Sequence, residues 1–494
     1  MLAATVVVTW GMGWGHGALA DDVGGAVVAA DKPVIEKLLD IMLNSGQISR
    51  NQYDELLEQS REEQASAATA AAQAIEEAPP SVSAGTTDWT FQWSNAFKLQ
   101  RNDGAFQLNF GGRIMADAAF VWLNDGLGAD LAALGIDPKD GSAVEFRRAR
   151  IFFEGTVYER VIFKAQYEFA NTGDGETDFK DVWLGLKKLG FVRDVRVGHF
   201  KEPFLLEEWT SSKYITFMER GLNNVFFPGR NMGIMAQGNQ LEKKLLWQAG
   251  FFYNTNDQGF AFEDWGDAGF DVAARLTGVP LYADDGAKVV HLGLGYIHQF
   301  RDGATDTLQF AQRPESHLAQ DWADTESFAA NDADILNLEL AGVCGPFSAQ
   351  AEFTGTWVQG TQGLRDSQLW GLYAFVSYFL TGEHRVYNLG NGRFGRVKPT
   401  ANFNPTRGDW GAWEIAFRYS YLDLNDKDLT GGRLWDVTAG VNWYLYPNLR
   451  LMFNYIHGDV DDRVSTNPAV PPVPPTLGVR GSGDIFQMRA QIDF

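Results

Sequence analysis

From about residue 89 to the C-terminus, apolar and polar residues alternate along segments of about ten residues. The clearest segments span 108–117, 148–157, 161–169, 413–421 and 437–445. A period of two places alternate side chains on opposite faces of a β-strand. One apolar and one polar face is typical of a strand that crosses an outer membrane, with lipid on one side and a lumen on the other. No uncharged apolar run reaches the roughly 20 residues of a membrane-spanning helix, so the pattern predicts an all-β, transmembrane antiparallel β-barrel.

The connections between the predicted strands alternate between tight turns and long polar loops. The turns include 158–160, 344–346 and 447–448, and the loops cover 121–143, 201–232, 254–268, 301–333 and 458–482. Short turns at one end and long loops at the other are the expected asymmetry of such barrels, and they place about sixteen strands. The segment 381–410 fits badly, because it is long but falls on the side of the short turns.

The chain closes on an amphipathic segment, residues 486–494. One face carries Phe486, Met488, Ala490, Ile492 and Phe494, and the other carries Gln487, Arg489, Gln491 and Asp493. A terminal aromatic residue on such a strand is the signal that outer-membrane barrels present to their assembly machinery. We therefore predict that Phe494 is recognised by this machinery and that the protein resides in a Gram-negative type of outer membrane.

The N-terminal residues predict export. A short apolar run from Val6 ends in Ala18-Leu19-Ala20, a small-residue cleavage pattern, so residues 1–20 are predicted to be a signal peptide. No Lys or Arg precedes Lys32. Since export signals usually begin with positive charge, we expect the true start to lie upstream of Met1.

Residues 21–88 are predicted to form a helical or coiled segment followed by a linker, with the barrel at 89–494. Helical periodicity covers 31–78, where Ser49 and Gln52 have the spacing of a capping box. The segment carries too few apolar residues to form its own core. Two roles stay open for it: a small oligomerising element, or a tether to the cell wall or to a partner.

Composition excludes several classes of function. The formal net charge of −22 argues against nucleic acid as a partner. The single cysteine, Cys344, permits no internal disulfide or CxxC metal site. The segment 171–178 resembles a calcium loop but lacks its spacing, so a solvated hairpin is expected there. Without an HExxH, GxSxG or GxxxxGK motif, the chain is expected to bind no metal or cofactor and not to be an enzyme.

Several stretches carry a family resemblance. In the first half they are Phe106-Gln107-Leu108, Gly112-Arg113, Val144-Glu145-Phe146-Arg147-Arg148-Ala149-Arg150, Phe179-Lys180-Asp181-Val182-Trp183, Val197-Gly198-His199-Phe200-Lys201-Glu202-Pro203-Phe204 and Leu206-Glu207-Glu208-Trp209-Thr210-Ser211-Ser212-Lys213 through Met218-Glu219-Arg220. Later matches are Phe394-Gly395-Arg396-Val397-Lys398-Pro399, Arg418-Tyr419-Ser420-Tyr421-Leu422-Asp423 and the closing strand. With these residues, most of 89–494 resembles the phosphate-selective porins of the O and P type. The resemblance implies a sixteen-stranded homotrimer whose long third loop folds into the lumen, where an arginine ladder and a few lysines near the constriction draw anions inward.

The candidate pore-lining and anion-binding residues are basic. Strand parity points these seven into the lumen: Arg113, Arg148, Arg150, Lys164, Arg275, Arg418 and Arg489. From the loop at 201–232 the resemblance adds Lys201, Lys213, Arg220 and Arg230 near the constriction. Parity also points acids inward, namely Asp117, Glu154, Glu168, Asp271 and Glu414. The sequence thus leaves open whether the lumen prefers anions or has mixed charge and weak selectivity.

These observations favour a porin for passive diffusion of small solutes, with anions such as phosphate as the expected class. The expected partners are outer-membrane lipid, small anionic solutes, the assembly machinery and two further copies of the chain. A general or cation-preferring porin is one alternative. A structural outer-membrane anchor tethered through the N-terminal helices is another, and an outer-membrane enzyme is a third.

Overall fold

The computed structural model describes residues 89–93, 96–170, 178–255, 269–301, 307–464 and 478–494, together with 43, 45, 49–54, 57 and 58. The chain divides into two units, Met1–Thr86 and Thr87–Phe494, and each is treated by itself. The predicted signal peptide, the linker and nearly all of the hairpin at 171–178 lie outside the described residues. No helix within the described ranges is long and apolar enough to cross a membrane.

In the N-terminal unit, residues 50–54 are helical. The backbone N–H of Ser49 donates to Gln52 Oε1 at 2.9 Å, and the backbone N–H of Gln52 donates to Ser49 Oγ at 3.4 Å. These reciprocal bonds satisfy two donors at the helix start. They confirm the predicted capping box, while the domain boundaries and the role of this unit stay predictions.

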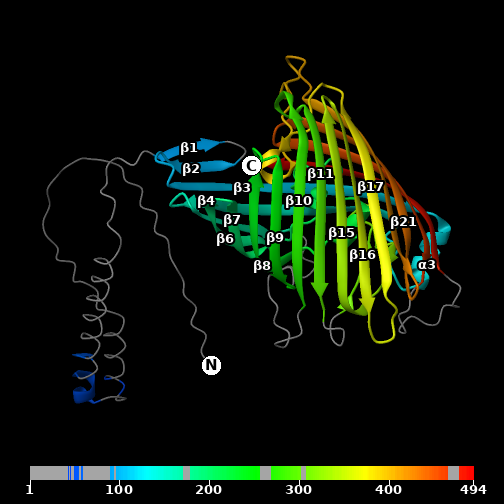
Figure 1. Ribbon diagram of the computed structural model, residues 1–494, viewed down its shortest axis with the longest axis horizontal. Coiled ribbons are helices and arrows are strands. Elements are labelled where there is room, and N and C mark those ends of the chain that lie inside the picture. The colour runs from blue at the N-terminus through cyan, green and yellow to red at the C-terminus, as the bar shows by residue number, and fades with distance from the viewer. Residues whose placement is uncertain are drawn as a thin grey trace. The chain divides into compact units, whose positions relative to one another are not determined.

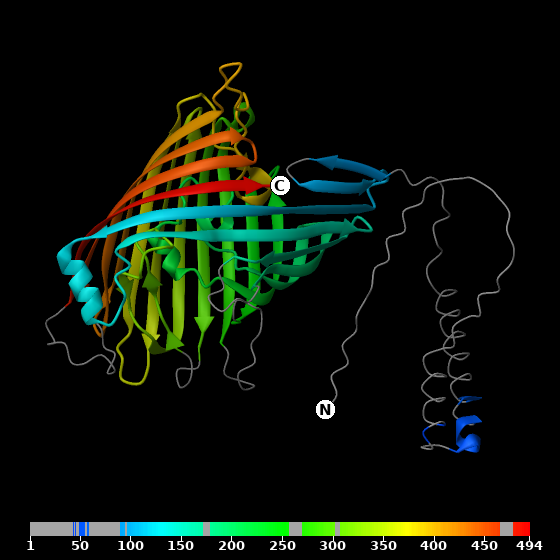
Figure 2. The same ribbon diagram turned by 180° about the vertical axis from the view of Figure 1, so that it is seen from behind.

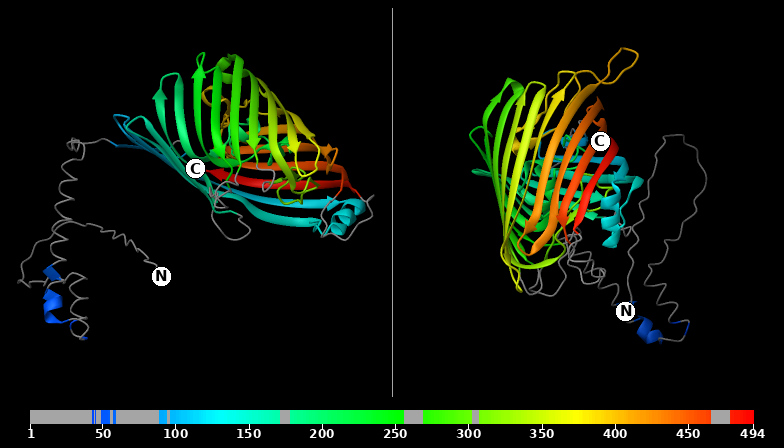
Figure 3. Two further views of the ribbon diagram at one scale, coloured as in Figure 1. Left: turned by 60° about the horizontal axis from the view of Figure 1, so that its bottom comes forward. Right: turned by 90° about the vertical axis from the view of Figure 1, so that its right-hand side faces the viewer.

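In the described part of the second unit, sixteen long strands form an antiparallel barrel (Figures 1 and 2). In chain order they are β3 (Phe106–Leu123), β4 (Gly141–Val157), β5 (Val161–Glu168), β6 (Asp178–Leu189), β7 (Val192–Lys201), β8 (Arg230–Gln240), β9 (Leu245–Tyr253), β10 (Phe270–Ala283), β11 (Lys288–Phe300), β15 (Phe328–Cys344), β16 (Phe347–Gly360), β17 (Ser367–Phe379), β20 (Ala412–Asp426), β21 (Leu429–Tyr446), β22 (Leu449–Arg463) and β23 (Val479–Asp493). Each pairs with the next, and β23 pairs with β3, which closes the ring. The left view of Figure 3 shows the red β23 beside the blue-cyan β3. The predicted fold class and strand number are confirmed.

The alternation predicted from sequence is present in the strands. In β20, Ile415 and Phe417 are 43% and 50% exposed on the outside, whereas Glu414 and Arg418 are buried within the lumen. This distribution is the reverse of that in a soluble protein, because apolar side chains face lipid and polar side chains fill the interior. Ahead of the barrel, a hairpin of β1 (Trp89–Trp93) and β2 (Phe97–Arg101) extends the ladder of β3 at residues 107–110.

The tight turns lie where the sequence places them, but several loops are shorter than predicted. Strands run on to Leu123 and Arg463, and β15 begins at Phe328, because strand residues near the barrel rim are polar and resemble loop residues. A helix not predicted, α3 (Asp125–Ala133), lies within the first loop. Its cap is Asn124, whose side chain accepts the backbone N–H of Leu127 at 2.8 Å.

Three connections fold into the barrel. The connection 202–229 carries α4 (Leu206–Trp209) and η1 (Leu222–Phe226), and the described residues 307–327 carry the short strands β12 (Thr307–Leu308), β13 (Ala311–Gln312) and β14 (Ala323–Asp324). The third, 380–411, carries β18 (Tyr387–Asn388), η3 (Leu389–Asn391) and β19 (Arg393–Phe394). Phe226 and Trp322 are buried in one shared apolar cluster, and Tyr387 and Phe394 in another. The inward fold of 380–411 explains its length on the turn side.

The closing seam between β3 and β23 contains a buried ion pair. Arg489 and Asp117 are register partners, with Nε–Oδ1 and Nη2–Oδ2 distances of 2.7 and 2.6 Å. The same guanidinium donates to Glu219 Oε1 at 2.7 Å, so it also ties the connection 202–229 to the seam.

We expect Arg489→Ala to destabilise the barrel by about 3–5 kcal/mol, because it leaves the Asp117 carboxylate buried without its partner. The measurement is the temperature at which the compact band of an unboiled sample converts to the unfolded band in SDS gels. Arg480→Ala is the control, since Arg480 lies on the same strand in an exposed ion pair with Asp462 and should change that temperature far less. Equal effects of the two substitutions would contradict the assigned role of the seam.

Candidate functional site: a cationic cavity in the lumen

A β-bulge in β4 turns two consecutive arginines toward the lumen. The pairing of β3 with β4 shifts between Met115 and Ala116, which face Arg148 and Phe146, so Arg147 has no partner in the ladder. Phe146 is exposed on the outside, while Arg147 donates two hydrogen bonds to Glu219 at 2.9 and 3.0 Å. In a regular strand, adjacent side chains point to opposite faces, so either Arg147 or Arg148 would face lipid. Because the bulge inserts one extra residue, both arginines can face the lumen.

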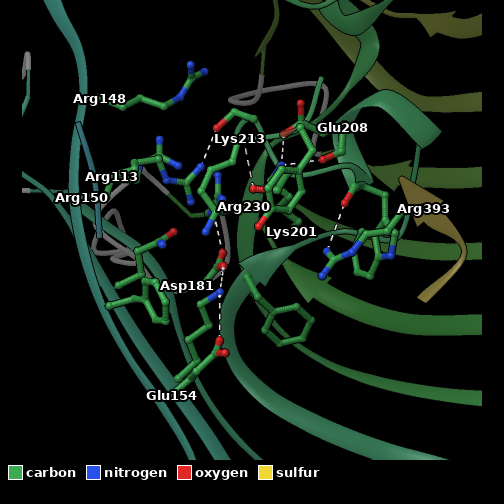
Figure 4. A pocket seen from close by; sticks show the side chains of 18 of the residues that line it. Arg113, Arg148, Arg150, Glu154, Asp181, Lys201, Glu208, Lys213, Arg230 and Arg393 are labelled. Carbon is green, nitrogen blue, oxygen red and sulfur yellow. Dashed lines mark hydrogen bonds and ion pairs between the residues drawn. The ribbon is translucent and has the colours of Figure 1, made fainter. Parts of the chain in front are cut away.

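A cavity of about 460 Å³ lies between the wall formed by β3 to β8 and the inward connection 202–229. Its ten cationic side chains are Arg113, Arg148, Arg150, Lys164, Arg196, Lys201, Lys213, Arg220, Arg230 and Arg393, against the acids Glu154, Asp181 and Glu208. Figure 4 shows Arg113, Arg148 and Arg150 on one side and Lys201, Glu208 and Arg393 on the other. In a chain of net charge −22, the lining thus has seven more cationic than acidic side chains, and two of the cations, Arg150 and Lys213, also pair with Glu168 and Asp493 outside the lining.

The acids in the cavity hold cations in place. Asp181 accepts from Arg230 Nε at 2.8 Å and lies 3.2 Å from Lys164 Nζ. Glu208, on α4, pairs with both Lys201 and Arg220. Carboxylates that bridge two cations in this way reduce the repulsion between them and restrict their side-chain freedom.

Three arginines of the cavity have no carboxylate within 4 Å among the described residues. Arg113 donates to Ser212 Oγ at 2.6 Å, and Arg393 donates to the backbone carbonyl of Trp209 at 3.2 Å. Arg148 is buried, its Nη1 lies 3.7 Å from the sulfur of Met115, and its Nε has no hydrogen-bond partner in the described part of the chain. Buried donors without partners are costly, so an anion that enters here gains hydrogen bonds that the protein does not supply.

The connection that carries Glu208 is held from the opposite wall. Glu352 on β16 accepts the backbone N–H groups of Leu206 and Glu207, each at 2.8 Å. On the other side of α4, the indole N–H of Trp209 donates to the carbonyl of Asn391 at 3.1 Å. Two inward connections and one strand therefore position the cavity together.

Ionisation in the inward connection follows its surroundings. Burial, followed by the charge of Arg113, lowers the pKa of Lys213 to about 8, although Asp493 opposes the shift from 3.4 Å. Burial alone would raise the pKa of Glu208, but the charges of Arg220 and Lys201 outweigh it and lower that pKa. Lys213 is thus a titratable part of the positive charge, whereas Glu208 stays ionised.

The structure brings eight of the eleven predicted basic residues to this cavity: Arg113, Arg148, Arg150, Lys164, Lys201, Lys213, Arg220 and Arg230. Two of these were expected in the loop but belong to strands, because β7 ends at Lys201 and β8 begins at Arg230, its register partner. Arg150 is paired with the predicted inward acid Glu168.

The other three predicted residues, Arg275, Arg418 and Arg489, point inward but do not line the cavity. Arg275 forms a bidentate pair with Glu339, both contacts at 2.7 Å, and also donates to the carbonyl of Gly392. Arg418 pairs with Glu315 in the connection 307–327 and with Glu207, 3.3 Å away. Their charges are matched, and they join inward connections to the wall.

Two lining arginines were missed by sequence reasoning. Arg196 lies between Val195 and Val197 in β7, so the alternation of that strand could have placed it in the lumen. Arg393 lies in the connection 380–411, and no local pattern shows that this segment turns inward. Among the aromatic lining residues, Phe152 was not named, and Trp183 was named only as part of the family resemblance.

Comparison with known proteins identifies the family of this chain. The family described as phosphate-selective porin O and P matches residues 128–494. The chain is 25% identical over 416 residues to Porin O of Pseudomonas aeruginosa, covering 77% of this chain and 89% of that protein. It is 28% identical over 384 residues to an uncharacterized protein of Caulobacter vibrioides, covering 76% and 73%. Among solved structures, the anion-selective porin from Comamonas acidovorans aligns with 79% of this chain and 100% of its own, at 13% identity and a TM-score of 0.48. Because the family match spans well over half of the chain, this barrel is an outer-membrane porin, and the chain belongs to the phosphate-selective porin O and P family.

Proposed function

We propose that this porin carries small anions, phosphate among them, by passive diffusion past the cationic cavity. The observation that carries the proposal is the excess of cationic over acidic side chains in one cavity of an otherwise acidic chain. Low-dielectric walls focus the field of such charges on solutes in the lumen. Arginine adds a planar fork that matches two oxygens of a phosphate, and lysine adds a mobile point charge.

Some of the acidic residues elsewhere are matched by cations or screened by solvent. Inward acids such as Asp117 and Glu339 are matched by Arg489 and Arg275. Charges in wide, wet loops are screened over about 8 Å at physiological salt. A general or cation-preferring porin remains the second candidate, and a structural anchor, which would not conduct, is the third.

We also propose the following finer points, which rest on the family resemblance and the sequence. The porin assembles as a homotrimer, residues 1–20 direct export, and Phe494 is read by the assembly machinery. The backbone of Phe494 is paired with Gly112, through N–H to carbonyl distances of 2.7 and 3.1 Å, so its ring can be removed without breaking the ladder.

Phe494→Ala should therefore reduce the amount of barrel inserted in the outer membrane while leaving the folded barrel nearly as stable. The first quantity is measured in isolated outer membranes and the second by the band-conversion temperature. Ile492→Ala, which removes a lipid-facing side chain from the same strand, is the control. Normal membrane levels of the Phe494 variant would contradict the proposed signal.

Replacing Arg148 and Arg150 together with Ala should lower the anion-over-cation permeability ratio at least about fivefold. A unit charge a few ångström from the path contributes about 1 kcal/mol even at the dielectric constant of bulk water. The ratio is obtained from the reversal potential across a planar bilayer in a KCl gradient. Arg365→Ala removes one arginine charge from an exposed ion pair with Asp428 and should leave the ratio nearly unchanged. A wild-type pore that prefers K⁺, or a double variant with unchanged ratio, would favour the general or cation-preferring porin.

Anion preference should decline as pH rises through about 8, because Lys213 is charged below its pKa and neutral above it. Reversal potentials measured on either side of this pH test the expectation. Lys213→Arg keeps the charge at every pH used, so its selectivity should vary less with pH. The decline should be smaller than that of the double arginine variant, since one charge is lost instead of two. An identical pH profile for wild type and Lys213→Arg would show that Lys213 is not the titrating group.

A further inference from the structure

Two large aromatic side chains occupy lumen-facing positions in the wall of the cavity. Phe152 follows Arg150 on the inward face of β4, and Trp183 lies on the inward face of β6 beside Lys164 of β5. Inward positions of a porin barrel are ordinarily polar, because they face water. Both rings remain only partly buried and line the cavity together with its cations.

The neighbouring strands provide room for these two residues. Gly111 is the register partner of Phe152, and a Cβ at Gly111 would lie 2.9 Å from the Phe152 ring. Gly198 is the register partner of Trp183, and a Cβ there would lie 2.6 Å from its Cα. Gly198 also has a φ of +137°, which L side chains rarely adopt. Each aromatic residue thus lies against a glycine, and a larger side chain at that glycine would clash with it.

Cations lie close to both rings. The Arg196 guanidinium is 4.6 Å from the centroid of Trp183. Lys164 and Lys213 place their ammonium groups 5.6 and 5.7 Å from the centroid of Phe152. Along β3 and β4, the register pair Arg113–Arg150 is one inward rung from Gly111–Phe152, a separation of roughly 7 Å at about 3.3 Å per residue. The wall therefore offers a flat apolar surface and a set of positive charges side by side.

The cavity exceeds the needs of a single inorganic anion. Its volume of about 460 Å³ lies within the range of about 300–1,000 Å³ in which proteins hold organic ligands of drug size. A site for bare phosphate gains nothing from aromatic surface, because the ion has no apolar part to bury.

We propose that this cavity recognises aromatic organic anions of the aryl phosphate class, in addition to inorganic phosphate. The phosphate group pairs with the arginines that lack a carboxylate partner, Arg113 and Arg148, while the ring lies against Phe152 or Trp183. Stacked or edge-on aromatic pairs gain attraction beyond that of apolar contact alone. This inference rests on the proposed anion path, since the cations must be available to an entering anion.

The test is block of the chloride current through single porin channels by three probes: inorganic phosphate, phenyl phosphate and cyclohexyl phosphate. The last two are closely similar in size and charge, but only phenyl phosphate has a π face. We expect phenyl phosphate to block at about three- to tenfold lower concentration than cyclohexyl phosphate, as aromatic pairs predict. This comparison uses the wild-type chain alone and does not depend on any variant that folds poorly.

Variants then locate the effect. Phe152→Leu and Trp183→Leu should each reduce the preference for phenyl over cyclohexyl phosphate, a ratio that is measured within each variant. Phe153→Leu is the matched control, because Phe153 is the next residue on the same strand and faces outward. It should leave all three block concentrations unchanged. Trp183→Phe keeps an aromatic ring and should retain much of the preference.

The possible failures are distinguishable. Equal block by phenyl and cyclohexyl phosphate, alongside block by inorganic phosphate, would overturn the aromatic inference and leave the anion porin intact. A preference that survives in both leucine variants would place the ring elsewhere and overturn the assigned site. If no phosphate blocks and the pore prefers K⁺, the proposed function fails and this inference fails with it.

Discussion

Closure of the backbone ladder is the constraint on which the rest of this molecule depends. Lipid offers no hydrogen-bond partners, so each spanning strand must pair on both sides, and the pairing of β23 with β3 removes the last free edge. The same closure turns the apolar faces outward and encloses a polar interior. A ring of sixteen strands encloses more space than its own side chains fill, and three connections fold inward to occupy it. Everything specific to this porin arises from how those connections are held.

The connections are held by burying charges in matched sets. Glu315 meets Arg418, and Glu339 meets Arg275, which in turn holds the carbonyl of Gly392 in the third connection. Removing one member of such a pair would leave the other charge buried without its partner. On the wall from β10 to β23, Arg275, Arg418 and Arg489 are matched in this way, whereas Arg113 and Arg148 on the wall from β3 to β8 have no carboxylate within 4 Å among the described residues. The structure therefore separates arginines that position the connections from arginines that line the cavity, although the alternation of the strands places both kinds in the lumen.

The limits of sequence reasoning follow from this separation. Alternation is local, so it revealed the strands, their faces and the closing segment, and the spacing of Ser49 and Gln52 revealed a capping box that the structure confirms. Ion pairs, in contrast, are not determined by local sequence. Arg418 and Glu315 lie far apart in the chain, and no pattern around Arg418 shows that its charge is already matched. The bulge at Arg147 was within reach, because two adjacent arginines between the outward Phe146 and Ala149 cannot both face water without an extra residue. The inward orientation of Arg393 could not be predicted from sequence, because it depends on the tertiary contacts of a segment without periodicity.

A channel site must attract a solute and also release it, which requires binding at several sites of modest strength. In this cavity, Asp181 and Glu208 each bind two cations, so those four carry fixed and partly neutralised charge. Among the described residues, Arg113, Arg148 and Arg393 are engaged only by a hydroxyl, a thioether and a carbonyl, and in the proposed path they exchange these neutral partners for a passing anion. The carboxylates thus do not simply weaken the attraction. In the proposed anion path they hold the surrounding cations in place and limit the depth of the binding site, and the less engaged arginines are the proposed steps along which an anion moves.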